Sequence, residues 1–417
     1  METRDAMMAL KSEILTRRAD FPSLARMHNG CPLAYLDGPA GTQMPRSVID
    51  AIVRYYTTSN ANTHGQFVTA MESDALLEDA RRLTALFTGA SDPRRISFGA
   101  NMTSLNFSLA WAIGRALRKG DEVLITQLDH EANRGPWLML RERGAVVREI
   151  RLKPDATLDY DDFAAKVNER TRLVAMGLAS NAFGTVNDVA FARKLTHAVG
   201  AWLLVDAVHY APHFPLEVET WGVDFLLCSA YKFYGPHVGI LYTREGLLEQ
   251  LETDRLRTQD QGAPYRIETG TLNHAAIAGV KAAVEYIATF GSGDDPRSQV
   301  VAGMKKIGAY EHALARSLYH GLQQIGGVTV RGPSFAQPLR APTVSFTLRG
   351  KRPEALCASL AGKGICVWDG NFYAVRPMEV LGLHDLGGVT RVGISLYNAE
   401  EEITRLLEAV TAEARTS

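Results

Sequence analysis

Two ionisable side chains directly follow apolar runs of the sequence. Lys232 comes after DFLLCSAY, and Asp206 closes the run AWLLVD. A lysine amine drawn into a partly buried site shifts its pKa readily and can form a Schiff base with a carbonyl compound. A buried carboxylate needs a cation or strong donors, and a protonated pyridine nitrogen would meet that need. The simpler alternatives are a surface lysine with a buried stem and an aspartate that caps a helix.

A stretch of small and capping residues, GANMT (99–103), lies between an apolar run and a helical pattern. Backbone N–H groups at such a helix start favour an anion, for example a phosphate monoester. An ordinary helix N-cap is the alternative. The spacing matches neither GxGxxG nor GxxxxGK[ST], which disfavours a dinucleotide or a nucleoside triphosphate. Together with the lysine and the carboxylate, a phosphate site indicates pyridoxal 5'-phosphate (PLP), which acts as an electron sink.

A histidine and an arginine lie at the ends of other apolar segments. His130 ends EVLITQLDH, and it could lie against an aromatic ring, transfer a proton, or be a satisfied structural histidine. Arg391, in TRVGISLYN, could clamp a substrate carboxylate or carry a surface charge. His209 and His213 are four residues apart, but Pro212 between them disfavours a regular helix, so we expect no metal site there.

The elements that must position these residues alternate between strands and helices. Several strand candidates are continuous apolar runs, which is typical of strands covered on both faces. Helical patterns at 104–120 and 189–200 separate them, so we expect an α/β fold with a largely parallel sheet. The last connection is too short for a crossover helix and predicts an antiparallel pair. The strand candidates are 95–99, 122–126, 145–150, 172–179, 201–207, 224–230 and 239–243.

The breaker stretch GSGDDP (291–296) follows a predicted helix at 274–290 and is the expected domain boundary. We therefore predict a large PLP-binding domain at 35–292 and a smaller α+β domain at 293–417. The smaller domain includes a predicted strand at ICVW (365–368). Residues 1–34 are predicted to form an arm, with a short amphipathic helix near Met8 and Ile14, that packs on the small domain.

The composition is that of an ordinary globular protein. Of 417 residues, 46% are hydrophobic and 22% charged, and the net charge of -1 gives no basic field for nucleic acid or an anionic membrane. The four cysteines form no CxxC pair, which fits a reducing cytosol. The sequence shows no signal-peptide pattern and no bilayer-spanning run. We expect a cytoplasmic protein without nucleic-acid or membrane partners.

Seven segments resemble those of one family in content and order: SFGANMTSLN, LDHEAN, SNAFGT, LLVDAVH, CSAYKFYGP, ETGTLN and RVGISLYN. They are similar to the class V aminotransferase superfamily of PLP enzymes, particularly its cysteine-desulfurase-like branch. The likeness extends from YLDGPAGTQMP (35–45) to Asn398. It implies the PLP-dependent fold type I, with a mostly parallel seven-stranded sheet in the large domain and a smaller C-terminal α+β domain.

The resemblance also implies roles for single residues. Lys232 would carry the internal aldimine, Asp206 would pair with the pyridine nitrogen, and His130 would stack on the ring. His209 would hydrogen-bond the phenolic oxygen, and Asn181 would lie near the ring. The phosphate would be held by Asn101, Met102, Thr103, Ser229 and Tyr231.

A homodimer with shared active sites is implied as well. Thr271, in ETGTLN, would reach the phosphate from a second subunit. Asn62 and His64, in SNANTHGQF, would lie at the entrance across the dimer interface. Arg391 would bind the carboxylate of an amino-acid substrate.

One segment departs from the desulfurase pattern. Desulfurases of this kind carry a nucleophilic cysteine in a pattern like GHHCA, and the matching stretch here is VWDGNFYAVRP, with Tyr373 at the cysteine position. Cys366 lies earlier, in the predicted strand, and is interpreted as a small core residue. Without a thiolate, persulfide formation by that route has no acceptor. The sequence DAVH is similar to epimerase-like and lyase-like members of the family.

These observations predict an enzyme that acts on a small amino acid through an external aldimine. β-Elimination of the C–S lyase type, transamination and epimerisation all stay open. Lys232 would be the base, with Tyr373 and His64 as further acid–base or substrate-contacting groups. The alternatives are a cysteine desulfurase that uses Cys366 and, in another class, a non-catalytic PLP-binding partner protein.

Overall fold

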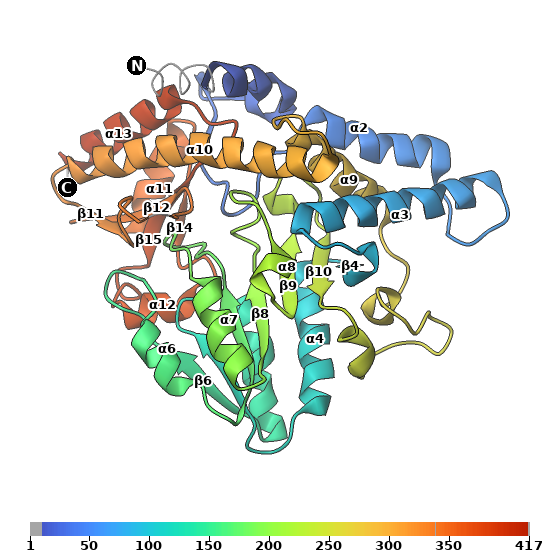
Figure 1. The fold of residues 1–417 in the computed structure, drawn as a ribbon. Helices are drawn as coiled ribbons and strands as arrows, with labels where there is room; N and C mark the ends of the chain where they lie inside the picture. The colour runs from blue at the N-terminus through green and yellow to red at the C-terminus, as the bar shows by residue number, and fades with distance from the viewer. Residues whose placement is uncertain (1–10, 338, 416–417) are drawn as a thin grey trace.

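A seven-stranded sheet forms the centre of the protein (Figure 1). The computed structural model describes residues 11–337 and 339–415. The strand order is β4-β10-β9-β8-β7-β5-β6. The strands are β4 (Ile96–Gly99), β5 (Glu122–Thr126), β6 (Val146–Ile150), β7 (Thr171–Gly177), β8 (Trp202–Asp206), β9 (Phe225–Ser229) and β10 (Gly239–Thr243). The predicted α/β class and the seven strands are confirmed.

The sheet is parallel from β6 to β9, and β10 runs antiparallel to both β9 and β4. The predicted antiparallel step after 224–230 is therefore confirmed. Since the carboxyl ends of parallel strands meet at one edge of a sheet, the residues that follow β5, β7, β8 and β9 are brought together there.

Both faces of the sheet are buried, which explains the continuous apolar runs. Val123 and Ile125 pack in the cluster that contains α4, whereas Leu124 between them packs in the cluster on the opposite face. Leu204 likewise belongs to the α4 cluster, and its neighbour Leu203 to the other. The helices associated with this part are α2 (Arg46–Arg54), α3 (Val68–Thr88), α4 (Met102–Ala116), α5 (Gly135–Leu138), α6 (Tyr160–Lys166), α7 (Val189–Ala198), α8 (Val218–Trp221) and α9 (His274–Ala288).

A second, antiparallel sheet of four strands lies in the C-terminal part, in the order β11-β12-β15-β14. The long helix α10 contacts α9 and α3 as well as β11 and α13, so it links the two parts (Figure 1). The predicted boundary at 292–293 falls between α9 and α10. The elements are α10 (Pro296–Gln323), β11 (Val328–Arg331), β12 (Thr343–Leu348), α11 (Pro353–Gly362), β14 (Trp368–Gly370), α12 (Val375–Val380), β15 (Val389–Gly393) and α13 (Glu400–Ala414).

The predicted single strand at 365–368 is wrong. The chain forms β13 (Ile365–Cys366), which pairs with β3 (Ala34–Tyr35), and then crosses to β14 in the other sheet. The apolar run 365–368 is divided because its two halves pair with strands of different sheets. Each half thereby satisfies its backbone hydrogen-bonding groups with its own partner strand.

The N-terminal arm lies against the C-terminal part of the chain. Residues 11–16 are helical, and the rest of the predicted helix, with Met8, lies outside the described residues. Glu13 pairs with Lys306 of α10 at 2.6 Å, and Arg18 pairs with Glu402 of α13 at 2.7 Å. Two further short strands, β1 (Met27–His28) and β2 (Cys31–Pro32), form a hairpin. Within the described ranges, none of the helices has the length and apolar character that crossing a membrane requires.

Candidate active site

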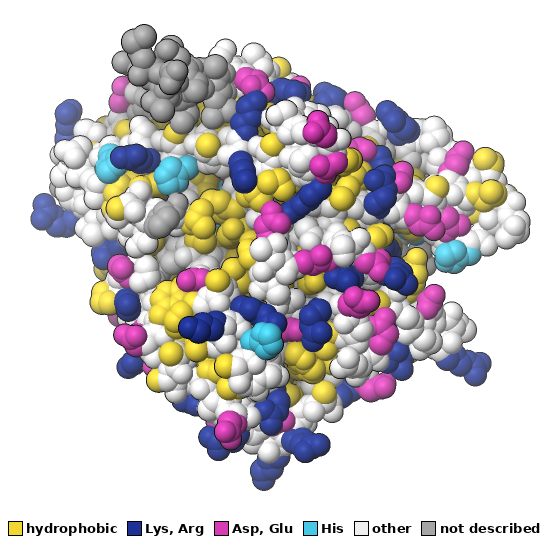
Figure 2. Space-filling model, in the orientation of Figure 1, with side chains coloured by type: hydrophobic (Ala, Val, Ile, Leu, Met, Phe, Trp, Pro, Cys, Tyr) yellow, Lys and Arg dark blue, Asp and Glu magenta, His cyan; other side chains and the backbone are white. Residues whose placement is uncertain are grey.

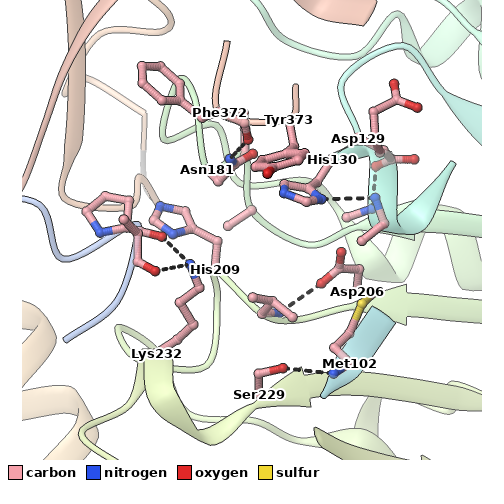
Figure 3. Close-up of a pocket in the computed structure, with 18 of the residues that line it drawn as sticks. Met102, Asp129, His130, Asn181, Asp206, His209, Ser229, Lys232, Phe372 and Tyr373 are labelled. Atoms are coloured by element: carbon pink, nitrogen blue, oxygen red, sulfur yellow. Dashed lines mark hydrogen bonds between the residues drawn. The ribbon is translucent and has the colours of Figure 1, made fainter. Parts of the chain in front are cut away.

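A cavity of about 810 Å³ lies at the carboxyl ends of the central strands. Residues that follow β4, β5, β7, β8 and β9 line it, and the C-terminal part adds the segment 368–373 and Arg391. Figure 3 shows Lys232, Asp206 and His130 around one space. The predicted site residues that line the cavity are Asn101, Met102, Thr103, His130, Asn181, Asp206, His209, Ser229, Tyr231, Lys232, Tyr373 and Arg391.

Three predicted residues do not line this cavity in the single chain. Asn62 and His64 are exposed on the loop between α2 and α3, and the N–H of His64 donates to Asp74 at 3.0 Å. Thr271 lines a separate cavity of about 330 Å³. Their predicted roles depend on a second subunit and remain proposals.

The Lys232 amine is buried, with only 8% of the residue exposed. It donates to the carbonyl oxygens of Ala40, at 2.9 Å, and Pro39. Burial lowers its pKa to about 7, and the nearby Arg391 guanidinium adds to this shift. The surface alternative for this lysine is therefore wrong. A pKa near 7 leaves much of the amine neutral and nucleophilic at neutral pH, as Schiff-base formation requires.

The Asp206 carboxylate closes β8 and is 7% exposed. Burial raises its pKa to about 6, against the hydrogen bond that it accepts from the Val208 N–H at 2.9 Å and the attraction of Lys232. That hydrogen bond is the one described contact of its carboxylate oxygens, so the group has room for a cationic partner in the cavity.

The start of α4 lies at the floor of the cavity. Asn101 caps the helix, because its side chain accepts from the Ser104 N–H at 2.8 Å, and Ser229 Oγ accepts from the Met102 N–H at 3.0 Å. Gly239, at the start of β10, has no room for a Cβ, which would lie 2.3 Å from the Asn101 carbonyl carbon. The GANMT segment therefore contains an ordinary helix N-cap, which was the alternative to an anion site. It also presents the N-terminus of α4 to the cavity, where an anion is favoured.

His130 is a neutral imidazole. Burial lowers its pKa to about 4, and the charges of Lys232 and Arg391 act in the same direction. Its Nδ1 accepts from the Ala132 N–H at 3.0 Å, so the ring proton resides on Nε2. The Tyr373 ring stacks on this imidazole at a centroid distance of 5.5 Å and an interplanar angle of 30°.

The segment that carries Tyr373 is held over the cavity at two points. The Asn181 amide donates to the Phe372 carbonyl at 2.9 Å (Figure 3). The Glu131 N–H donates to the Tyr373 carbonyl at 2.8 Å. Phe372 and Tyr373 have left-handed backbones, with φ of 56° and 60°. Such conformations cost non-glycine residues about 1 kcal/mol or more each. The two hydrogen bonds to Asn181 and Glu131 help to hold this conformation.

Arg391 is 2% exposed, so the surface-charge alternative is wrong. Its Nη2 pairs with Asp37 Oδ1 at 2.9 Å, and its Nη1 donates to the Asn181 carbonyl at 3.2 Å. The guanidinium also lies 4.1 Å from the centre of the Phe372 ring. Its Nε has no hydrogen-bond partner among the described residues. A substrate carboxylate here would share the guanidinium with Asp37.

His209 and His213 have different partners. His209 Nε2 lies 2.9 Å from Thr343 Oγ1, whereas His213 Nδ1 lies 2.7 Å from Glu311 Oε2, outside the cavity lining. Among the described residues, no group of three or more metal-binding side chains occurs.

Asp129 and Asp37 were missed by the sequence reasoning. The buried Asp129 carboxylate accepts from the backbone N–H groups of Gly177, at 2.6 Å, and Thr126, at 3.0 Å, and so joins the ends of β7 and β5. Burial raises its pKa to about 7. Its position next to His130 in LDH could have signalled it. Asp37, in YLDGPAG, gave no signal of its ion pair with Arg391, which is 354 residues away in sequence.

None of the four cysteines (Cys31, Cys228, Cys357 and Cys366) lines the cavity. Cys366 sits in β13 beside Tyr35, and burial raises the pKa of its thiol, as do the charges of Asp37 and Glu402. A raised pKa disfavours the thiolate, which is the nucleophilic form.

The sequence is similar to a known protein family over most of its length. The family model "Aminotransferase class-V" matches residues 34–406. The chain belongs to this family. It is 32% identical to a probable cysteine desulfurase of Synechocystis over 98% of both chains, and 33% identical to a cysteine desulfurase of Escherichia coli over 94% of this chain and 95% of that one.

Solved structures of desulfurases have the same fold. The cysteine desulfurase CsdA of Escherichia coli matches with a TM-score of 0.85 and 27% identity, over 97% of this chain and 98% of that one. The apo cysteine desulfurase of Thermococcus onnurineus matches with a TM-score of 0.87 and 26% identity, over 96% of this chain and 98% of that one.

Class V aminotransferases use PLP, and this chain is accordingly a PLP-dependent enzyme. The cavity fits the cofactor on three observations of its own. The Asp206 carboxylate lacks a cationic hydrogen-bond partner, His209 Nδ1 is buried without a partner among the described residues, and the α4 N-terminus faces the same space. These match a pyridinium nitrogen, a phenolic oxygen and a phosphate.

Proposed function

We propose that this enzyme cleaves the carbon–sulfur bond of L-cysteine or a close relative. The observation that carries the proposal is the match to proteins named cysteine desulfurases over nearly the whole chain, at about a third identity. The similarity favours the desulfurase alternative over transamination and epimerisation. The C–S lyase reaction breaks the same bond, and it therefore remains a second candidate reaction.

PLP, when bound, supplies the electron sink for bonds at Cα of an amino acid. The Lys232 amine would hold the cofactor, and it would accept and return the proton at Cα of a bound amino acid. Asp206 would pair with the ring nitrogen and favour its protonated form, and the neutral His130 would pack against the ring. The start of α4, with Ser229 beside it, would hold the phosphate.

The substrate is held from the C-terminal part of the chain. Arg391 binds its carboxylate, since the guanidinium lines the cavity and has an unpaired Nε. Tyr373, which lines the cavity and stacks on His130, would contact the substrate side chain. Asp37 and Asn181 orient the guanidinium through their contacts with it.

A homodimer completes the site in this proposal. The projection formed by α2 and α3 carries exposed hydrophobic side chains, among them Tyr56, Phe67 and Met71, and Figure 2 shows such side chains at its tip. Monomeric surfaces rarely group large apolar side chains in this way. The same projection carries Asn62 and His64, which would then reach the partner's cavity. Thr271 would reach the partner's phosphate.

The desulfurase and lyase reactions differ in the product that contains the sulfur. A desulfurase converts cysteine and an acceptor thiol into alanine and the acceptor's persulfide. A lyase converts cysteine and water into pyruvate, ammonia and sulfide. Since no cysteine of this chain lines the cavity, a desulfurase reaction here would use a thiol from another molecule.

The test uses the purified PLP-loaded enzyme with L-cysteine, with and without dithiothreitol as acceptor. Alanine, pyruvate, ammonia and sulfide are quantified, and Lys232→Ala serves as the inactive control. Alanine that forms only with the thiol supports desulfuration, and pyruvate that forms without it supports elimination. Cys366→Ala should leave either rate unchanged. The proposal fails if L-cysteine yields neither alanine nor pyruvate above the control.

A further inference from the structure

One ring nitrogen of His209 makes a hydrogen bond, and the other has no hydrogen-bond partner among the described residues. His209 lies in the loop after β8, lines the cavity and is 4% exposed. Its Nε2 is 2.9 Å from Thr343 Oγ1 at the start of β12, and its Nδ1 is buried without a partner among the described residues. In Figure 3 the ring lies beside the Lys232 side chain.

The imidazole is neutral and therefore carries a single proton. Burial lowers its pKa well below the ordinary value. Three positive or potentially positive groups act in the same direction. They are His213, whose ring centroid is 5.3 Å away, Lys232 and Arg391. The carboxylate nearest to this histidine pair, Glu311, bonds to His213 and not to His209.

The Thr343 hydroxyl decides which nitrogen holds that proton. Thr343 is completely buried, and within the described part of the chain His209 Nε2 is the one hydrogen-bond partner of its Oγ1. If Nε2 carried the proton, it would donate to Oγ1, and the hydroxyl proton would have no acceptor. Such an unsatisfied buried donor costs about 1–3 kcal/mol. If the hydroxyl donates to Nε2, the hydroxyl proton and the Nε2 lone pair are both used, and Nδ1 carries the ring proton as the one group left for a ligand. The other tautomer leaves two groups without partners, the hydroxyl proton and the Nδ1 lone pair.

We propose that Thr343 is a positioning residue that fixes His209 as the Nδ1–H tautomer, so that the site presents a hydrogen-bond donor where the cofactor's phenolic oxygen binds. The proposal deepens the proposed site and rests on it for the identity of the acceptor. The tautomer itself follows from Thr343 and holds whichever amino acid the enzyme uses.

By this assignment, Thr343 of the C-terminal sheet determines which ring nitrogen of His209, in the loop after β8, is a hydrogen-bond donor. Thr343 itself is anchored from both sides. Its backbone pairs with Gly393 of β15, and its carbonyl accepts from the buried Arg340 guanidinium at 2.6 Å. These contacts fix the Thr343 backbone, and with it the place from which the hydroxyl reaches His209 Nε2.

The first test is direct observation of the tautomer. The protein is labelled with ¹⁵N-histidine, and two-bond ¹H–¹⁵N correlations distinguish a protonated from an unprotonated ring nitrogen, with and without PLP. His209→Gln identifies the signals of this residue. We expect a protonated Nδ1 and an unprotonated Nε2 in both states. A protonated Nε2 in the cofactor-free protein would overturn the proposal.

The second test compares two substitutions at position 343. Thr343→Val keeps the shape and removes the hydroxyl, whereas Thr343→Ser keeps the hydroxyl. We expect Thr343→Val to give a mixture of tautomers and about fivefold weaker PLP binding, as for the loss of one hydrogen bond. Thr343→Ser should retain the wild-type tautomer and affinity. A wild-type tautomer in Thr343→Val, or a mixture in Thr343→Ser, would contradict the assignment.

These readouts are separate from the proposed function. If L-cysteine is no substrate but Nδ1 is protonated, the proposed function fails and the role of Thr343 stands. Should Thr343→Val fail to fold, the wild-type spectrum and the Thr343→Ser variant still decide the question.

Discussion

Replacing Asp206 by asparagine should stabilise the cofactor-free protein while impairing the enzyme. The carboxylate is buried without a cationic hydrogen-bond partner, and its pKa rises from 3.8 to about 6. A group whose pKa is raised on folding contributes most to stability below its unfolded pKa, and that contribution is lost as the pH rises through the folded value. The loss therefore occurs between about pH 4 and pH 6.

The size of the effect follows from the shift. A difference of about two pKa units corresponds to about 3 kcal/mol at pH 8, where Asp206 is charged in both states, and to about 1.5 kcal/mol at pH 5. Asparagine carries no charge and can still accept the hydrogen bond of the Val208 N–H. For a chain of this size, 3 kcal/mol corresponds to an increase in Tm of about 3–4 °C.

The assay is thermal unfolding of the cofactor-free Asp206→Asn and wild-type proteins at pH 5 and pH 8, at one protein concentration. Asp224→Asn is the matched control, because Asp224 is an equally buried aspartate that pairs with Arg244 at 2.7 Å. Its substitution should lower the Tm. With PLP bound the order should reverse, since asparagine cannot pair with a cationic ring nitrogen. A gain that is equal at both pH values, or a loss at pH 8, would refute the reasoning.

Three further outcomes are expected. The rate at which the free chain takes up PLP should rise about tenfold per pH unit up to about pH 7 and then level off, because the neutral Lys232 amine is the nucleophile; Lys232→Ala should show no cofactor attached by mass spectrometry after borohydride reduction. Arg391→Lys should raise KM for cysteine about tenfold but leave the inhibition constant of cysteamine, which lacks the carboxylate, unchanged; equal losses for both would contradict carboxylate binding. Tyr373→Phe should keep kcat within about twofold and Tyr373→Ala should lower it about fivefold, because the ring stacks on His130; a hundredfold loss in Tyr373→Phe would instead assign acid–base catalysis to the hydroxyl.

The sequence was most informative where strands are buried on both faces. The bounds of β5 and β10 agree with their predicted ranges, because an uninterrupted apolar run needs a cover on each side and ends where the polar loop begins. The same rule located Asp206 and Lys232, since each stands at the point where such a run stops. It failed at 365–368, where the choice between two sheets depends on strands far away in sequence.

Contacts between distant segments could not be predicted. Arg391 was recognised as a candidate, but its ion pair with Asp37 joins the two ends of the chain. The bond between Thr343 and His209 spans 134 positions, and threonine in a strand has no signal that separates a positioning role from ordinary β propensity. The left-handed backbone at Phe372 and Tyr373 is equally hidden, because neither residue type favours it.

In the free chain, three groups of the site lack the partner or environment that each requires. Burial favours a neutral Lys232 amine and a protonated Asp206, and it leaves His209 Nδ1 without an acceptor. A ligand with a carbonyl carbon, a cationic ring nitrogen and a phenolic oxygen meets all three needs in one molecule. Each unmet need costs free energy because burial desolvates the group, so each also disfavours ligands that lack the matching group. We therefore expect the polar groups that folding leaves unsatisfied to contribute to the choice of cofactor, and Asp206→Asn to lower this selectivity while it stabilises the free chain.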